Sequence, residues 1–133
     1  MQDIFAARIM TTDLHTVSPD TLVEDAANEM LDHDIGSVVV VDEGNQVEGI
    51  LTTTDFVRIV AERRPKDETP VSAYMSENVL TGSAQDSIRE IADRLVTYGI
   101  HHLPVVDETE GLIGMVTTTD LAGYLADLEV PAA

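Results

Sequence analysis

The sequence predicts an α/β fold of the α+β kind, with mixed sheets, built from two tandem β-α-β-β-α repeats. Two observations predict it. The heptapeptide GILTTTD at residues 49–55 returns as GMVTTTD at residues 114–120, and the same offset of 65 gives 14 identities over the 53 gap-free positions from Arg8/Ala73 to Val60/Leu125. Chance would give only a few, so the unit is duplicated. Both copies also show the same order of predicted strands and helices.

The first copy opens with a predicted short helix at residues 3–9 and a short strand at 14–17. Thr21 and Glu24 have the spacing of a capping box, in which each side chain bonds to the backbone N–H of the other residue. The apolar residues from 23 to 31 recur at spacings of three and four, which predicts a helix with one buried face.

Two strands and a second helix complete this copy. The β-branched run 38–41 predicts a strand buried on both faces. Residues 47–51 predict the next strand, and residues 53–55 open a helix that runs to about residue 63.

The second copy repeats this order, and Asp86 is its predicted helix N-cap. Its predicted elements are a strand at 80–82, a helix from 88 to 95, strands at 103–106 and 112–116, and a helix from 118 to 127. Residues 65–70, with two prolines and several charges, link the copies. The expected domains are therefore 1–64 and 65–133, which share one globular core because each copy alone would be marginally stable.

The chain is strongly acidic, with 25 acids against 7 bases and a net charge of −18. Lys66 is the one lysine. This composition resembles that of proteins from halophilic microbes, the alternative being an ordinary acidic protein. The missing basic footprint argues against nucleic acid as a partner. The lack of cysteine, of a signal peptide and of a membrane span predicts a cytoplasmic protein with no membrane partner.

A family resemblance rests on the two β-α-β-β-α units, on the strand motif HHLPVVD at residues 101–107, and on the two Gly-h-x-Thr-x-x-Asp turns, in which h is a hydrophobic residue. In these features the chain resembles the CBS (cystathionine-β-synthase) domain family over residues 5–126. In the first copy, Val39 stands where this family often has proline. The resemblance implies a stand-alone pseudo-twofold pair of repeats with two ligand clefts.

The Thr-x-x-Asp turns are the candidate binding elements. At a strand-to-helix turn, backbone N–H groups and the helix dipole favour a phosphate. The hydroxyls of Thr52, Thr54, Thr117 and Thr119 add donors, and the carboxylates of Asp55 and Asp120 can accept the hydroxyls of a ribose. The alternative is that each motif merely caps its helix, since threonine and aspartate are favoured caps.

The resemblance implies which other residues would complete each cleft, with adenine lying on strand residues. One cleft would combine Thr52, Thr54, Asp55 and Arg58 with Val79, Leu80, His101, His102 and Pro104. The other would combine Thr117, Thr119 and Asp120 with Leu14, His15, Ile35, Gly36, Ser37 and Val39.

The two clefts are expected to differ in charge. Arg58 follows Asp55 by three residues, whereas its counterpart is Gly123, so the second cleft has no obvious cation. We expect the first cleft to take a phosphorylated ligand, and the second an S-adenosyl compound or nothing. If the His102 cation matters, affinity should weaken between about pH 6 and 8, because an ordinary imidazole titrates near 6.5.

The sequence therefore predicts a regulatory module that senses an adenine nucleotide (AMP, ADP or ATP) or an adenosyl compound. No catalytic, metal or cofactor site is expected, and the sequence carries no enzyme signature. His33, between Asp32 and Asp34, suggests a cation but fits a solvated helix end better. The expected partners are a second copy of the chain and an unidentified effector protein. The alternative is a ligand-free dimerisation module that pairs through Phe56, Val57, Val60, Leu121 and Leu125.

Overall fold

The computed structural model describes residues 4–127. Within them the chain divides into two compact units: unit 1 holds residues 4–14, 80–108 and 113–127, and unit 2 holds residues 15–79 and 109–112. Each unit combines helices with a small sheet, which confirms the mixed α+β class and the two repeats. Throughout residues 4–127, every helix is too short or too polar to cross a membrane.

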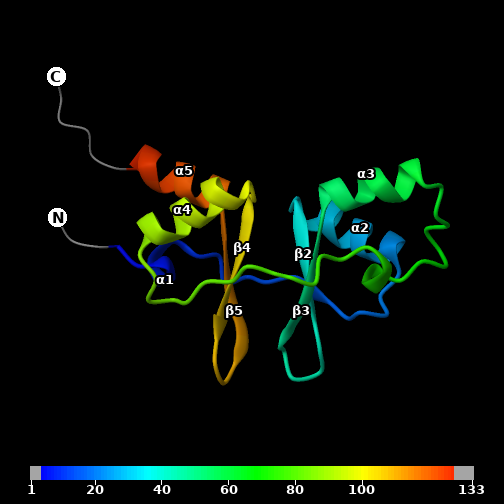
Figure 1. The fold of residues 1–133 in the computed structure, drawn as a ribbon, viewed down its shortest axis with the longest axis horizontal. Helices are drawn as coiled ribbons and strands as arrows, with labels where there is room; N and C mark the ends of the chain where they lie inside the picture. The colour runs from blue at the N-terminus through cyan, green and yellow to red at the C-terminus, as the bar shows by residue number, and fades with distance from the viewer. Residues whose placement is uncertain (1–3, 128–133) are drawn as a thin grey trace. The chain divides into compact units, whose positions relative to one another are not determined.

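Unit 2 contains a three-stranded mixed sheet. β1 (Thr16–Val17) pairs parallel with β2 (Ser37–Val41), which pairs antiparallel with β3 (Val47–Thr52). α2 (Val23–His33) and α3 (Thr53–Ala61) belong to the same unit (Figure 1). The first four residues of β2 are buried, as its β-branched run predicts.

Unit 1 repeats this arrangement with a shorter sheet. Its elements are α1 (Ala6–Ile9), α4 (Ile88–Tyr98), β4 (His102–Asp107), β5 (Gly111–Thr117, from residue 113 on) and α5 (Thr118–Asp127) (Figure 1). The helix expected at 3–9 is thus shorter, and residue 3 lies outside the described residues. The strand expected at 80–82 is reduced to one parallel bridge between Gly82 and Val105.

The segments that lead into the two repeats are exchanged between the units. Ala6 of α1 is fully buried in the core of unit 1, among residues of the second repeat. Its counterpart 65 residues later, Val71 in the short 3-10 helix η1 (Val71–Ala73), is fully buried in the core of unit 2. Thr11 bridges Met115 in the same way that Ser76 bridges Ile50. The compact units therefore cross the expected boundary between residues 64 and 65.

The capping box expected at Thr21 and Glu24 is wrong. The Thr21 hydroxyl accepts the Ser18 N–H at 3.1 Å, inside the preceding turn, and α2 begins after Leu22 without a side-chain cap. Backbone carbonyls of the 65–70 linker replace the missing cap: the N–H of Val23 bonds to the Thr69 carbonyl at 2.9 Å. The free N–H groups at a helix start need partners, and here the linker supplies them.

The N-cap expected at Asp86 is wrong by one residue. Ser87 caps α4, and its hydroxyl accepts the Glu90 N–H at 3.1 Å. Asp86 instead accepts the Ser83 N–H at 2.9 Å and pairs with Arg94 at 2.7 Å. The carboxylate is used by the loop before the helix, so the next residue takes the cap.

Candidate functional site

The first Thr-Thr-Thr-Asp motif, residues 52–55, joins β3 to α3 in unit 2; we call it the Asp55 turn. The Asp55 Oδ2 accepts the Thr52 N–H at 2.8 Å as part of a capping box. Its Oδ1 pairs with Nη2 of Arg58 at 2.5 Å, and the residue is only 4% exposed. Both carboxylate oxygens are therefore engaged inside unit 2, and the guanidinium expected to meet a phosphate is held by Asp55.

The second motif, residues 117–120, joins β5 to α5 in unit 1; we call it the Asp120 turn. Here too a capping box forms, since Asp120 Oδ2 accepts the Thr117 N–H at 2.9 Å and Thr117 Oγ1 accepts the Asp120 N–H at 3.1 Å. The Thr11 hydroxyl lies 3.4 Å from both carboxylate oxygens, at the long end of hydrogen bonding. Capping is thus present at both turns, as the alternative interpretation predicted.

The two turns differ most at the position three residues after the aspartate. Arg58 covers Asp55, whereas its counterpart in α5 is Gly123. A Cβ built on Gly123 would have no neighbour within 4 Å. Asp120 is only half-buried, and no arginine stands over it from α5. The carboxylate that can still accept donors from a ligand is therefore that of Asp120.

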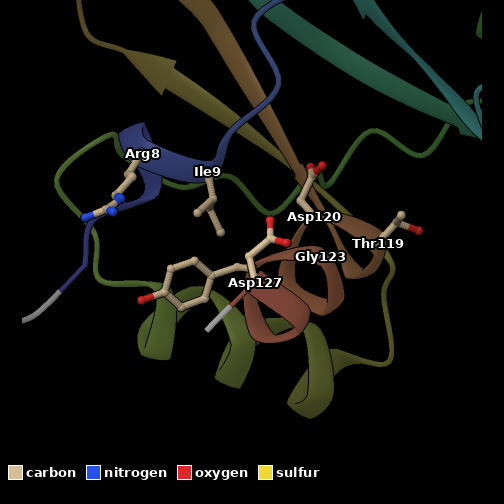
Figure 2. A pocket seen from close by; sticks show the side chains of 7 residues that line it. Arg8, Ile9, Thr119, Asp120, Gly123 and Asp127 are labelled. Atoms are coloured by element: carbon tan, nitrogen blue, oxygen red, sulfur yellow. The ribbon is translucent and has the colours of Figure 1, made fainter. Parts of the chain in front are cut away.

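Asp120 lines a pocket of about 490 Å³ in unit 1. Its lining comes from α1 and α5 and consists of Arg8, Ile9, Thr119, Asp120, Gly123, Tyr124 and Asp127 (Figure 2). The volume falls within the range of about 300–1,000 Å³ that small-molecule sites occupy. The lining combines one guanidinium, two carboxylates and a phenol, which together can bind a ligand carrying hydroxyls and charges of both signs.

Arg8 brings a cation to the pocket beside the Asp120 turn, which the sequence did not indicate. It reaches the pocket from α1, 112 residues before Asp120, and its counterpart in the other copy is Ala73. The repeat therefore gave no signal for it. Tyr124 and Asp127 were also missed, although they follow Asp120 at i+4 and i+7 and so share a helix face with it.

His101 and His102 lie beside the Asp120 turn, in the same unit. The Thr118 N–H donates to the His101 carbonyl at 3.1 Å, as the Thr53 N–H donates to the Gly36 carbonyl at 3.3 Å in unit 2. Burial lowers the pKa of His102 below 6.5, and His101 adds to this effect while Asp120 opposes it. The neutral form of His102 is therefore favoured at pH 7, and any loss of affinity through its deprotonation is expected at lower pH than for an ordinary imidazole.

We expect His102 to make folding stability depend on pH. Below about pH 6.5 the unfolded chain takes up a proton that folded His102 resists, so stability falls as pH drops through this value and is fully present above it. His102→Gln should flatten the fall between about pH 7.5 and 5.5 in urea unfolding at fixed salt. The other three histidines are present in both the unaltered chain and the variant. Equal slopes of the free energy of unfolding against pH in these two chains would therefore contradict the prediction.

The other expected contacts divide between the units. Unit 1 holds Leu14, Leu80, His101, His102, Pro104, Thr117, Thr119 and Asp120; unit 2 holds His15, Ile35, Gly36, Ser37, Val39, Thr52, Thr54, Asp55, Arg58 and Val79. Each predicted cleft draws on both units, so these groupings stay predictions. Ser37, Val39 and Pro104 are buried.

Comparison with known proteins adds independent findings. The CBS domain family model matches residues 6–62 and 71–127, again 65 residues apart. A 17.7 kDa protein of Acidianus ambivalens is 34% identical over 92% of this chain and 73% of its own length. The CBS domain-containing protein YhcV of Bacillus subtilis is 34% identical over 85% of this chain and 79% of its own. The CBS domain pair of protein MJ0100, solved with 5′-methylthioadenosine and S-adenosyl-L-methionine, superposes with a TM-score of 0.85 at 23% identity, covering 94% of this chain and 98% of its own.

Proposed function

The chain belongs to the CBS domain family, and on that premise we propose that it is a regulatory module that binds an adenosine-containing ligand at the Asp120 turn. One observation carries the proposal: the half-buried Asp120 carboxylate lines a pocket together with Arg8. A carboxylate accepts both hydroxyls of a ribose cis-diol, and charge-assisted bonds of this kind are stronger than neutral ones.

The charges of the pocket favour an adenosyl compound over a nucleotide. Asp120 and Asp127 outnumber Arg8, so a triphosphate would be repelled. S-adenosyl-L-methionine, which carries a sulfonium, an ammonium and a carboxylate, offers charges of both signs, and 5′-methylthioadenosine is neutral. The binding of these two compounds by the CBS domain pair of MJ0100 supports this choice. AMP or ATP at the Asp55 turn is the less favoured candidate, because it must first displace Arg58 from Asp55.

The binding site is tested by matched asparagine variants. Asp120→Asn keeps an oxygen for the Thr117 N–H but removes the charge, and it should weaken binding of 5′-methylthioadenosine or S-adenosyl-L-methionine at least about tenfold. Asp55→Asn should leave the affinity within about twofold. Titration calorimetry with both compounds, AMP and ATP measures this. Equal loss in the two variants, or loss in Asp55→Asn alone, would refute the assignment to Asp120.

The Gly123→Arg variant gives a more direct test of whether the ligand binds at Asp120. It copies the Arg58 arrangement onto α5, and the guanidinium should occupy the Asp120 carboxylate and abolish binding. Replacing a helical glycine by arginine should also stabilise the helix by about 0.8 kcal/mol, so lost binding cannot be ascribed to unfolding. Full binding by Gly123→Arg would mean that the ligand does not use this pocket.

A ligand-free dimerisation module is the second candidate. Of the residues expected to pair, Val57, Val60 and Leu125 are 67%, 77% and 64% exposed, whereas Phe56 and Leu121 pack partly into the cores of their own units. Exposed apolar residues on helices suit association with a second copy. Sedimentation with and without ligand, together with titration calorimetry, separates the two candidates. A purely structural dimer would form to the same extent with and without ligand, and it would release no heat of ligand binding in calorimetry.

In the cytoplasm, the module would pass the ligand signal to an effector protein and perform no chemistry itself. The acidic surface would adapt it to concentrated salt, as a halophilic origin implies, because at high ionic strength the repulsion among its acids is screened.

A further inference from the structure

Two histidines and a glutamate converge in unit 2, in a cluster that the proposed function does not use. His15 immediately precedes β1, while Glu29 and His33 lie one turn apart on α2. One ligand atom from each of the three side chains lies within 4.8 Å of the other two. We propose that His15, Glu29 and His33 bind a divalent transition metal ion, with Zn²⁺ as the best-suited ion.

The spacing of the donor atoms supports a shared ion. Nδ1 of His15 lies 3.7 Å and Nε2 of His33 lies 3.4 Å from the same Oε2 of Glu29. With Zn–N bonds of about 2.0–2.1 Å, tetrahedral geometry places neighbouring donors about 3.3–3.4 Å apart. The two separations between a histidine nitrogen and the Glu29 oxygen are therefore close to those around a shared tetrahedral ion.

The two imidazole rings must turn for the ion to enter. They stack with centroids 3.6 Å apart and planes 20° from parallel. A metal ion lies in the plane of each ring that binds it, so nearly parallel rings cannot both direct a lone pair at one ion. The His33 side chain is 41% exposed at the end of α2 and has room to rotate out of the stack.

The donor types select the class of ion. Imidazole nitrogen suits zinc, copper and nickel, whereas calcium and magnesium prefer sites made wholly of oxygen. Two histidines and a carboxylate supply three ligands and leave a fourth position for water or another donor. The chain has no cysteine, so thiolate does not compete for the ion.

The cluster is not a requirement of the repeated fold. The counterparts of His15, Glu29 and His33 in the other repeat are leucine, arginine and tyrosine, at positions 80, 94 and 98. The simpler interpretation is a helical Glu-His pair at i and i+4, but such a pair has no use for His15 from outside the helix. The test therefore centres on His15.

Zinc titration of the EDTA-treated full chain in about 1 M KCl tests the proposal, since this salt concentration screens weak binding by scattered acids. We expect one Zn²⁺ per chain, with affinity lowered at least about tenfold in each of His15→Gln, His33→Gln and Glu29→Gln. Glu48→Gln makes the same charge change as Glu29→Gln at an exposed site in the same unit and should bind normally.

Two measurements on the unaltered chain guard against variants that fail to fold. Histidine ring NMR signals of His15 and His33 should shift on addition of Zn²⁺ while those of His101 and His102 stay in place, and Co²⁺ should give the absorption of a four-coordinate ion. Unchanged affinity in His15→Gln, or equal shifts at all four histidines, would overturn the proposal. Because the site lies in unit 2, its failure would leave ligand binding at the Asp120 turn standing.

Discussion

Replacing Gly111 by alanine is expected to lower the free energy of unfolding by more than about 3 kcal/mol. Gly111 has φ +77°, in the left-handed region where an L-residue is strained by about 1–2 kcal/mol. A Cβ at this position would lie 2.1 Å from the carbonyl oxygen of Asn45. That oxygen cannot easily move away, because it accepts the Leu112 N–H at 3.0 Å and the Asn45 side chain donates to the Glu110 and Leu112 carbonyls at 2.9 Å.

Gly99→Ala is the matched control for this loss. Gly99 ends α4 with φ +64°, and a Cβ there would meet nothing within 4 Å. Its replacement should cost about 1 kcal/mol, from backbone strain alone. Urea unfolding of both variants at one fixed salt concentration isolates the Asn45 contact as the difference. Equal losses would show that the turns at Asn45 and Gly111 do not touch in solution.

The elements that the sequence predicted well are those specified by neighbouring residues. The β-branched run of β2 and the strand-to-helix motif before α5 need no distant partner, and both were placed within a residue or two. The exchange of Ala6 and Val71 between the units depends on which core each segment enters, and an apolar residue is compatible with either core. The same holds for α2, whose first N–H groups are capped by linker carbonyls more than 40 residues away.

The sequence located the two candidate turns in the fold, but it did not reveal which residues surround them. The repeat located both turns. The i, i+3 spacing of Asp55 and Arg58 is that of a helical ion pair, so their contact could have been predicted from the sequence. The same alignment places Gly123 opposite Arg58, so it also predicts that no arginine of the helix covers the Asp120 carboxylate. Arg8 could not be found, since only the folded chain carries it across 112 residues of sequence to α5.

Salt is expected to stabilise this chain by several kcal/mol. Two exposed carboxylates about 10 Å apart repel by about 0.4 kcal/mol before screening, by about 0.15 kcal/mol in 0.1 M salt and by about 0.01 kcal/mol in 1 M salt. Eighteen excess negative charges form tens of such pairs, and unfolding relieves much of their repulsion by spreading the charges. The ion pairs of Arg58 and Arg94 are screened less by the same salt, because the side chains of Asp55 and Asp86 are only 5% and 22% exposed.

The melting temperature should therefore rise by roughly 10–20 °C between about 0.1 M and 2 M KCl. A variant with four exposed acids neutralised carries a net charge of −18 + 4 = −14; suitable changes are Asp32→Asn, Glu43→Gln, Glu48→Gln and Glu77→Gln. Because the electrostatic repulsion scales with the square of the net charge, the rise in melting temperature of this variant should be about 40% smaller than that of the unaltered chain. A rise of the same size in both chains would point to general salt effects on apolar surface, and no rise in the unaltered chain would mean that its acids are spaced too widely to repel.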